Sequence, residues 1–236
     1  SVLESSLRGK RVNLNFIDNV FTGGGIGGQI YADRLVSSLF VNNDFYDSSG
    51  NAIWLDGGSI YNNTFINLTI KNTNSSFYDM AINVLGTGFN THTYFIDMSS
   101  VLNYTFTNLR IAVKSSNFGE IKFLNGVNGS GTNLSNDIQI KNNSASVKVG
   151  QNPGFNRPAQ ITLYNIGNRS FVNPAIKRNL ANCPANVCTA LTPLDAQTVK
   201  FNVTGFANSV TTYRVGDRSR AFDPSVVPMA FSQPEA

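Results

Sequence analysis

The chain has 236 residues and a mass of 25.6 kDa, enough for one elongated domain with a sizeable core. Charged residues make up only 14% of it, and the net charge of +4 comes from scattered basic residues, which argues against a nucleic-acid partner. No run of about 20 apolar residues occurs, so no membrane span is expected within this sequence. Abundant Asn, Ser, Thr and Gly instead favour a mostly β, turn-rich protein.

The first residues, 1–11, form a polar lead in which one helical turn around Leu3–Leu7 is expected. Val12–Thr22 then alternates apolar and polar residues as a strand does. The glycine run Thr22–Gly28 contains the G-x-G-x-x-G spacing, but no amphipathic helix or suitably placed acidic residue follows it. We therefore expect a turn or a close-packed loop there rather than a dinucleotide site.

Short alternating segments that carry Asn and Phe recur along the chain and are its most informative feature. Phe45 follows Phe21 by 24 residues, and Phe65 follows Phe45 by 20 residues. Such a period predicts a solenoid whose turns stack on one another. We interpret Phe21, Phe45, Phe65 and Phe106 as one aromatic column in the core and the corner Asn residues as hydrogen-bonded ladders. The recurring segments are Leu14–Phe21, Leu39–Asp47, Ile60–Ile70, Leu102–Val113 and Leu134–Ser144.

A second kind of short strand follows some of these segments. Asn51–Leu55, Ala81–Leu85 and Glu120–Leu124 are predicted to lie on a neighbouring face of the same turns.

Four regions are expected along the chain. They are the lead 1–11, β-helix repeats over 12–170, a C-terminal β cap over 171–220 with a cysteine pair and a β-hairpin within Thr198–Asp217, and a proline-bearing tail over 221–236. A solenoid needs an atypical cap because its last turn would otherwise leave an open edge. The alternative fold is an antiparallel β-sandwich.

The two cysteines, Cys183 and Cys188, have a spacing compatible with a local disulfide across a turn. The single histidine, His92, is far from them in sequence, so no zinc site is expected. A disulfide implies an oxidising compartment. Nine Asn-x-Ser/Thr sequons, which accept glycans in exported proteins, point the same way to an extracellular or cell-surface glycoprotein. They begin at Asn62, Asn67, Asn74, Asn103, Asn128, Asn133, Asn142, Asn168 and Asn202.

The stretches IYNNTFINLTIKNT, NAIWLDGG and NYTFTNLRI resemble coils of the right-handed parallel β-helix (pectate-lyase-like) superfamily. The cysteine pair followed by TVKFNVTGFANSVTTYRVG resembles the closing segment of archaeal β-helix surface glycoproteins. The resemblance covers roughly residues 12–216 and implies an all-β, right-handed solenoid in an extracytoplasmic setting. It implies no reaction, because the superfamily includes lyases, hydrolases, epimerases, adhesins and inert shells.

No catalytic residue, metal site or cofactor is predicted. Asp44 and Asp47 stand where a strand ends in a turn, and Asp56 has no carboxylate partner nearby in sequence. Asp33 and Asp79 are further away from these three residues in the sequence. The Gly-His-Gly and Arg-x-Lys signatures of polygalacturonase-like enzymes are absent, and His92 lacks an adjacent carboxylate to make it a general base.

These features predict a non-enzymatic extracellular structural glycoprotein, such as a surface-layer, filament or sheath subunit or an adhesin module. Its partners would be copies of itself, contacted through its ends, with the lead and the tail as contact segments, together with cell-surface glycans. The alternatives are a polysaccharide lyase or hydrolase, and a carbohydrate-binding adhesin that stacks sugars on exposed aromatic residues.

Overall fold

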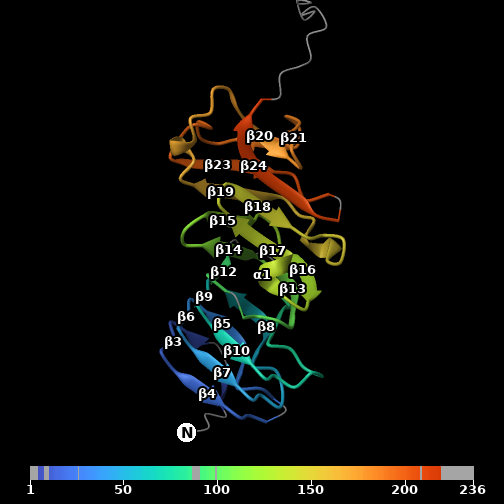
Figure 1. Ribbon diagram of the computed structural model, residues 1–236. Coiled ribbons are helices and arrows are strands. Elements are labelled where there is room, and N and C mark those ends of the chain that lie inside the picture. Colours follow the sequence, from blue (N-terminus) through green and yellow to red (C-terminus); the bar gives the residue numbers. More distant parts are fainter. Residues whose placement is uncertain are drawn as a thin grey trace, which may run out of the picture.

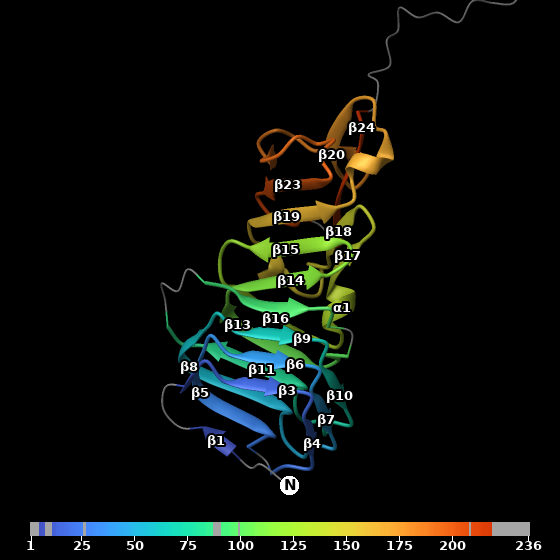
Figure 2. The same cartoon turned by 90° about the vertical axis from the view of Figure 1, so that its left-hand side faces the viewer.

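The computed structural model describes residues 5–7, 11–25, 27–86, 91–98, 100–207 and 209–218. Strands stack along the long axis of the molecule, with β3 (Asn15–Ile17) and β4 (Val20–Thr22) near one end and β20 (Pro174–Arg178) near the other (Figure 1). The N-terminal part is a β-solenoid of about four turns of parallel coils, which confirms the predicted fold class. Figure 2 shows these turns lying flat on one another.

The turns of the solenoid contribute strands to three parallel stacks. The first stack contains β1 (Ser5–Leu7), β2 (Arg11–Val12), β5 (Ile30–Val36), β8 (Ile53–Tyr61), β11 (Met80–Val84) and β13 (Tyr104–Leu109). The second contains β3, β6 (Leu39–Val41), β9 (Thr64–Ile66), β12 (Thr93–Ile96) and β14 (Ile111–Ser115). Among the described residues, the third contains β4, β7 (Asp44–Tyr46) and β10 (Thr69–Lys71). Ser5–Leu7 is therefore a strand, and the expected helical turn at Leu3–Leu7 is wrong.

The corners between stacks explain why Asn and Asp recur. Asp18, Asn42 and Asn67 occupy equivalent corners with φ of 55°, 51° and 48°, a left-handed conformation that Asn and Asp adopt readily. Their side chains also stack: Asn42 Nδ2 donates to Asp18 Oδ1 at 3.1 Å, and Asn67 Nδ2 donates to Asn42 Oδ1 at 3.1 Å. The predicted corner ladders are thus confirmed, with a repeat of 24 to 25 residues.

A second set of Asn side chains points inward at the corners, with Asn63 between the first and second stacks and Asn43 between the second and third. Asn63 is fully buried; its Oδ1 accepts the Ser38 N–H at 3.0 Å, and its Nδ2 donates to the Leu35 carbonyl at 2.8 Å. Asn43, also fully buried, donates in the same way to the Phe16 carbonyl at 2.8 Å. These amides satisfy backbone groups that the tight bends leave without strand partners.

The predicted aromatic column is buried, but it is two columns rather than one. Phe16, Phe40, Phe65 and Phe95 stack in the second stack with centroid separations of 4.8, 4.8 and 5.5 Å, close to the strand spacing. Phe21 stacks on Phe45 in the third stack at 4.6 Å. The 20-residue spacing from Phe45 to Phe65 therefore joins non-equivalent positions, because Ile70 is the residue that pairs with Phe45.

Beyond Ser115 the pairing becomes antiparallel. β15 (Gly119–Phe123) pairs antiparallel with β14, and β16 (Val127–Gly131) pairs antiparallel with β13. Repeats were expected over residues 12–170. The parallel ladders extend only as far as β14, which ends at Ser115. Glu120–Leu124 therefore does not form a further turn, and Leu134–Ser144 forms the one-turn helix α1 (Leu134–Asp137) followed by β17 (Ile138–Lys141) rather than a coil.

Two sheets continue into the C-terminal part. A nine-stranded sheet runs β22-β23-β19-β15-β14-β12-β9-β6-β3, and a five-stranded sheet runs β17-β18-β24-β20-β21. The remaining elements are β18 (Ser144–Val147), η1 (Pro153–Phe155), β19 (Ala159–Tyr164), η2 (Gly167–Arg169), β21 (Ala181–Asn182), β22 (Cys188–Ala190), β23 (Thr198–Val203) and β24 (Thr211–Asp217).

Two expectations for the cap have different outcomes. The disulfide between Cys183 and Cys188 is present, with the two Cα atoms 6.0 Å apart. The β-hairpin within Thr198–Asp217 is wrong, because β23 joins the nine-stranded sheet and β24 joins the five-stranded sheet. The connection between them crosses from one sheet to the other. The tail 221–236 lies outside the described residues.

Candidate functional site

The carboxylates considered for catalysis are spread over different stacks, and Asp47 and Asp56 accept structural hydrogen bonds. Asp44 begins β7 of the third stack, whereas Asp56 lies on β8 of the first stack and accepts the Asn83 Nδ2–H at 2.9 Å. Asp47 is a left-handed corner whose Oδ1 accepts from Asn72 at 3.0 Å. The solenoid therefore does not bring these carboxylates to one point.

His92 and Asp79 are buried and hold the backbone in place. His92 is 7% exposed, and its Nε2 lies 2.7 Å from the Phe123 carbonyl, so Nε2 carries the hydrogen that is donated to this carbonyl. Burial lowers the pKa of His92 to about 4, and this keeps the ring neutral near pH 7. Asp79 Oδ2 accepts the N–H groups of Leu102 at 2.7 Å and Asn103 at 3.1 Å. Across the part of the chain that is described, no three His, Cys, Asp or Glu side chains are placed to hold a metal ion.

The Gly run forms a close-packed loop, as expected. Gly28 has φ of +94°, and a Cβ there would lie 2.3 Å from the Asn51 carbonyl oxygen. A side chain at this position would push the loop away from the next turn of the solenoid.

The first turn of the solenoid presents an open edge. β3 and β4 are terminal strands of their sheets within the described ranges. Asp18 N–H donates to Val41, and Asp44 N–H donates to Asn19, so these residues face the second turn. By the alternation of a strand, the N–H groups of Ile17 and Val20 point the other way, out of the end of the solenoid. We call these outward edges of β3 and β4 the first-turn edge.

Apolar side chains accompany the first-turn edge. Ile17 is 50% exposed and Val20 is 61% exposed. Phe16 stacks on Phe40 and is only partly buried. Val20 is in register with Asp44 and Thr69 of the later turns, so an apolar residue stands where the repeat elsewhere carries polar ones. An exposed apolar strand edge of this kind is a pairing surface for another strand.

The opposite end of the same nine-stranded sheet is β22. It pairs with β23 on one side and is the terminal strand of the sheet on the other. The Cys183–Cys188 disulfide closes the loop that leads into it, and the Cys188 N–H donates to the Pro184 carbonyl at 3.0 Å. A single sheet therefore runs along the molecule (Figure 2), and in its strand order the terminal strands are β3 and β22.

Charge is distributed unevenly between the two ends. Residues 12–118 contain seven Asp against four Lys and Arg, whereas residues 119–218 contain four acidic against ten basic residues. The part of the chain beyond Phe118 is therefore basic, and the solenoid is mildly acidic.

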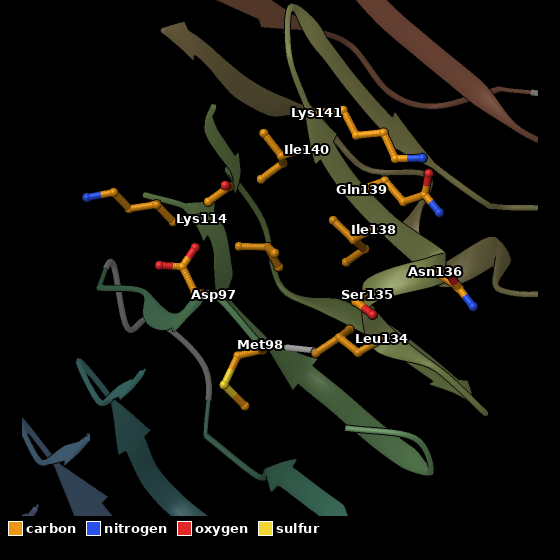
Figure 3. Close-up of a pocket in the computed structure, with 12 residues that line it drawn as sticks. Asp97, Met98, Lys114, Leu134, Ser135, Asn136, Ile138, Gln139, Ile140 and Lys141 are labelled. Carbon is orange, nitrogen blue, oxygen red and sulfur yellow. The ribbon is translucent and has the colours of Figure 1, made fainter. Parts of the chain in front are cut away.

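A groove lies where the parallel and antiparallel parts meet (Figure 3). Its walls are the Asp97–Met98 corner and β14 on one side and α1 with β17 on the other, around a cavity of about 430 Å³. Ile138, Ile140 and Leu134 point into it, whereas Gln139 and Lys141 point to the other side of β17 (Figure 3). We call this the junction groove; its floor is apolar and its rim is polar.

An aromatic pair lies on the outer face of the first stack. Tyr31 and Trp54 are in register, with ring centroids 4.9 Å apart in an edge-to-face arrangement. Both are partly exposed, and Asp56 with Asn83 follows on the same face two residues further along the strands. Aromatic rings beside polar side chains offer stacking and hydrogen bonds to a sugar.

The sequon residues have unequal exposure. Asn62, Asn67, Asn74, Asn128, Asn142 and Asn168 are exposed, whereas Asn103, Asn133 and Asn202 are partly buried. Asn67 and Asn62 donate from Nδ2 to neighbouring corners, and Asn133 caps α1 by accepting the Asn136 N–H at 3.0 Å. Glycosylation at these positions stays a prediction.

Searches with this sequence and structure found no matching family model, no matching curated protein and no matching solved structure. Within the described ranges, no helix has the length and apolar character that crossing a membrane requires. Neither the first-turn edge nor the junction groove was predicted from the sequence. Val20 distinguishes the edge, because the residues that pair with this position in later turns, Asp44 and Thr69, are polar. This difference can be recognised only when the pairing of the strands is known.

Proposed function

We propose that the protein is a non-enzymatic, extracellular structural subunit of the pectate-lyase-like β-helix type that joins copies of itself end to end. The first-turn edge carries this proposal. It combines free backbone groups with two exposed apolar side chains, and natural proteins usually protect such an edge unless it binds something.

In this proposal the first-turn edge of one copy meets the β22 end of the next. The contact would extend the nine-stranded sheet across the junction by main-chain hydrogen bonds, with Ile17 and Val20 buried against the partner. The two surfaces differ, so the contact is head-to-tail and repeats into a filament unless its rotation closes a ring. The basic part beyond Phe118 and the mildly acidic solenoid add electrostatic attraction.

The extracellular setting rests on two chemical features. A disulfide forms and persists in oxidising compartments, and Cys183 and Cys188 are paired. Six exposed sequon Asn residues provide sites for glycans that would keep the flanks of a filament solvated. Surface-layer, sheath and adhesin roles all fit such a subunit.

Sedimentation velocity and negative-stain microscopy over a range of concentrations test the proposal. The full chain should form linear polymers, and the double variant Ile17→Lys/Val20→Lys should remain monomeric, because charge on a strand edge blocks pairing. Leu102→Lys is the matched control, since Leu102 is also 50% exposed but lies on the flank of the solenoid. A wild-type chain that stays monomeric at every concentration would contradict the proposal.

The Tyr31–Trp54 pair favours carbohydrate binding as a second candidate function. A glycan array should then show selective binding that Trp54→Ala removes and Tyr164→Ala does not. Loss of binding without loss of polymers would assign the two activities to separate faces.

A further inference from the structure

A second cavity, of about 460 Å³, lies on the five-stranded sheet and has a polar lining. β18, β24 and β20 are neighbours in this sheet (Figure 1). Residues of the turn that joins β17 to β18 and of the turn that joins β20 to β21 contribute to the lining. We call it the arginine cavity; the side chains that matter here are Asn142, Ser144, Arg169, Asn179, Thr212 and Arg214.

Asparagine side chains hold the two turns of the arginine cavity to β24. Asn143 is buried; its Nδ2 donates to the Val215 carbonyl at 2.8 Å, and its Oδ1 accepts the Val215 N–H at 3.0 Å. Asn179 Oδ1 accepts the Thr212 N–H at 2.8 Å, and the Asn179 N–H donates to the Thr212 carbonyl at 2.9 Å. Both asparagines have a left-handed backbone, with φ of 52° and 47°. The walls of the cavity are therefore preformed, and a ligand need not order them.

Two guanidinium groups from different elements line the arginine cavity. Arg169 ends η2, and its Nη2 donates to Asn142 Oδ1, whereas its Nε is buried and has no hydrogen-bond partner. Arg214 lies on β24, is exposed, and makes no hydrogen bond or ion pair with another described residue. A guanidinium carries five N–H donors in a fixed fork, so both side chains retain donors for an oxyanion.

The strand register places further positive charge beside Arg214. Lys177 of β20 pairs with Arg214, and Lys141 of β17 pairs with Ser144. The ladder between β18 and β24 puts Ser144 opposite Arg214 on the other side. Residues that are directly opposite in antiparallel strands point to the same face of a sheet, so Lys141, Arg214 and Lys177 form a basic row across one face.

No carboxylate offsets this charge in the arginine cavity. None of the described residues that line it is Asp or Glu. Asp217, the acidic residue of β24, is three positions from Arg214, so its side chain points to the opposite face of the sheet. Its Oδ1 accepts the Asn173 N–H at 2.9 Å. The cavity therefore favours an anion over a cation or a neutral ligand.

The rest of the lining is suited to hydroxyl groups. Ser144 and Thr212 each bring a hydroxyl that both donates and accepts. Asn142 keeps its Nδ2 hydrogens, because its Oδ1 is the atom that faces Arg169. Leu180 adds an apolar contact of the kind that covers one side of a sugar ring. The volume is within the usual range of small-ligand sites.

We propose that the arginine cavity binds a sugar that carries one oxyanion group, either a sulfate ester or a carboxylate. Arg169 and Arg214 bind the oxyanion by charge-assisted hydrogen bonds, and Asn142, Ser144 and Thr212 bind the hydroxyl groups of the ring. The site lies on the five-stranded sheet, whereas the first-turn edge and the exposed aromatic pair lie on the parallel turns. This inference is therefore independent of end-to-end assembly.

NMR titration of the full chain tests the ligand class. The protein is produced without N-glycosylation, because Asn142 begins a predicted sequon. Glucose 6-sulfate or glucuronate should shift the amide signals of Asn179 and Leu180 to saturation, and the one that binds more tightly identifies the oxyanion. Glucose lacks the charge, and methyl sulfate and acetate lack the ring, so all three should bind about tenfold more weakly or not at all.

Three results of this titration would overturn the proposal. The first is that neither sugar acid shifts these signals. The second is that glucose binds as tightly as the better sugar acid, because the arginines would then have no role. The third is that methyl sulfate or acetate binds as tightly as the corresponding sugar acid, because the ring would then add nothing.

Matched arginine variants test the location of the site. Arg214→Gln should weaken binding of the better sugar acid about tenfold, because a charge-assisted pair is lost while the exposed position leaves the fold intact. Arg157→Gln removes the same charge from an exposed arginine that does not line the cavity, and it should bind as the wild type does. The double variant Ile17→Lys/Val20→Lys should also bind normally, whether or not the wild type forms polymers. Equal weakening in both arginine variants would assign the attraction to net charge and overturn the proposal.

Discussion

The parallel solenoid and the antiparallel cap bury their aromatic residues in different ways. In the solenoid, Phe40 and Phe65 lie nearly parallel with an interplanar angle of 21°, one turn above the other. In the cap, Phe206 and Tyr213 meet edge to face at 75°, and the Tyr213 hydroxyl donates to the Gly205 carbonyl at 2.6 Å. The stacked column can accept another ring at its open end, whereas the cap cluster is closed. The aromatic column is therefore open at the first turn of the solenoid, whereas the aromatic cluster of the cap is enclosed.

The largest expected effect is loss of a ring from the middle of the stacked column. Phe65→Ala should lower the free energy of unfolding by about 3–5 kcal/mol, because Phe65 is fully buried between two rings. Phe16→Ala, at the open end of the column, should cost less than half as much. Urea unfolding monitored by circular dichroism measures both, and equal losses would show that the column is not extensible at Phe16.

Acid should weaken the junction between the two parts through His92. Its pKa is about 4 in the folded protein and about 6.5 when unfolded, so between these values the unfolded chain binds more protons. The free energy of unfolding should therefore fall as the pH drops from 6.5 to 4, by about 3 kcal/mol in total, and this contribution should change little outside that window. His92→Gln should remove this slope. An unchanged slope in the variant would assign the acid sensitivity to other groups.

Inner and outer corner amides of the solenoid should differ in their effect on stability. Asn63→Ala leaves the buried Ser38 N–H without its acceptor and removes a donor from the Leu35 carbonyl, which should cost about 2–3 kcal/mol. Asn62→Ala removes an exposed ladder bond and places Ala at a φ of 57°, which should cost about 1 kcal/mol. Thermal unfolding of the two neighbouring variants gives the difference directly. A larger loss at Asn62 would reverse this assignment of the two corner layers.

The most local effect is expected in the cap. Cys183→Ser with Cys188→Ser opens a short loop and should cost about 2 kcal/mol or less. The loss should be confined to β22 and its surroundings, with hydrogen exchange in β6 and β9 unchanged. Faster exchange throughout the solenoid would mean that cap and solenoid unfold as one unit.

The sequence predicted the features that repeat and missed those that depend on chain direction. Asn42 and Asn67 could be assigned to corners because their left-handed backbone and their stacking both favour Asn. Glu120–Leu124 has the same alternation as Ala81–Leu85, yet its strand runs antiparallel, because alternation determines which face a residue occupies and not which way the strand runs. The reversal occurs in the tight turn Ser116–Phe118 before Gly119, which has a φ of +145°.

The candidate sites were harder to predict from the sequence for a related reason. The two ends of a sheet become visible only when the order of all its strands is known, and β3 and β22 are about 170 residues apart. The disulfide was predictable because it is local. The junction groove lies where the third stack has no further strand within the described ranges, and the absence of a strand cannot be predicted from a residue pattern.

The most direct test of the account is hydrogen exchange at the Ile17 and Val20 amides in dilute and in concentrated protein. Both amides should exchange fast in the dilute monomer and at least tenfold slower after assembly, while the Phe16 and Phe21 amides, which face the second turn, should change little. Fast exchange at Ile17 and Val20 in assembled material would show that the open end of the solenoid is not the surface that joins the subunits.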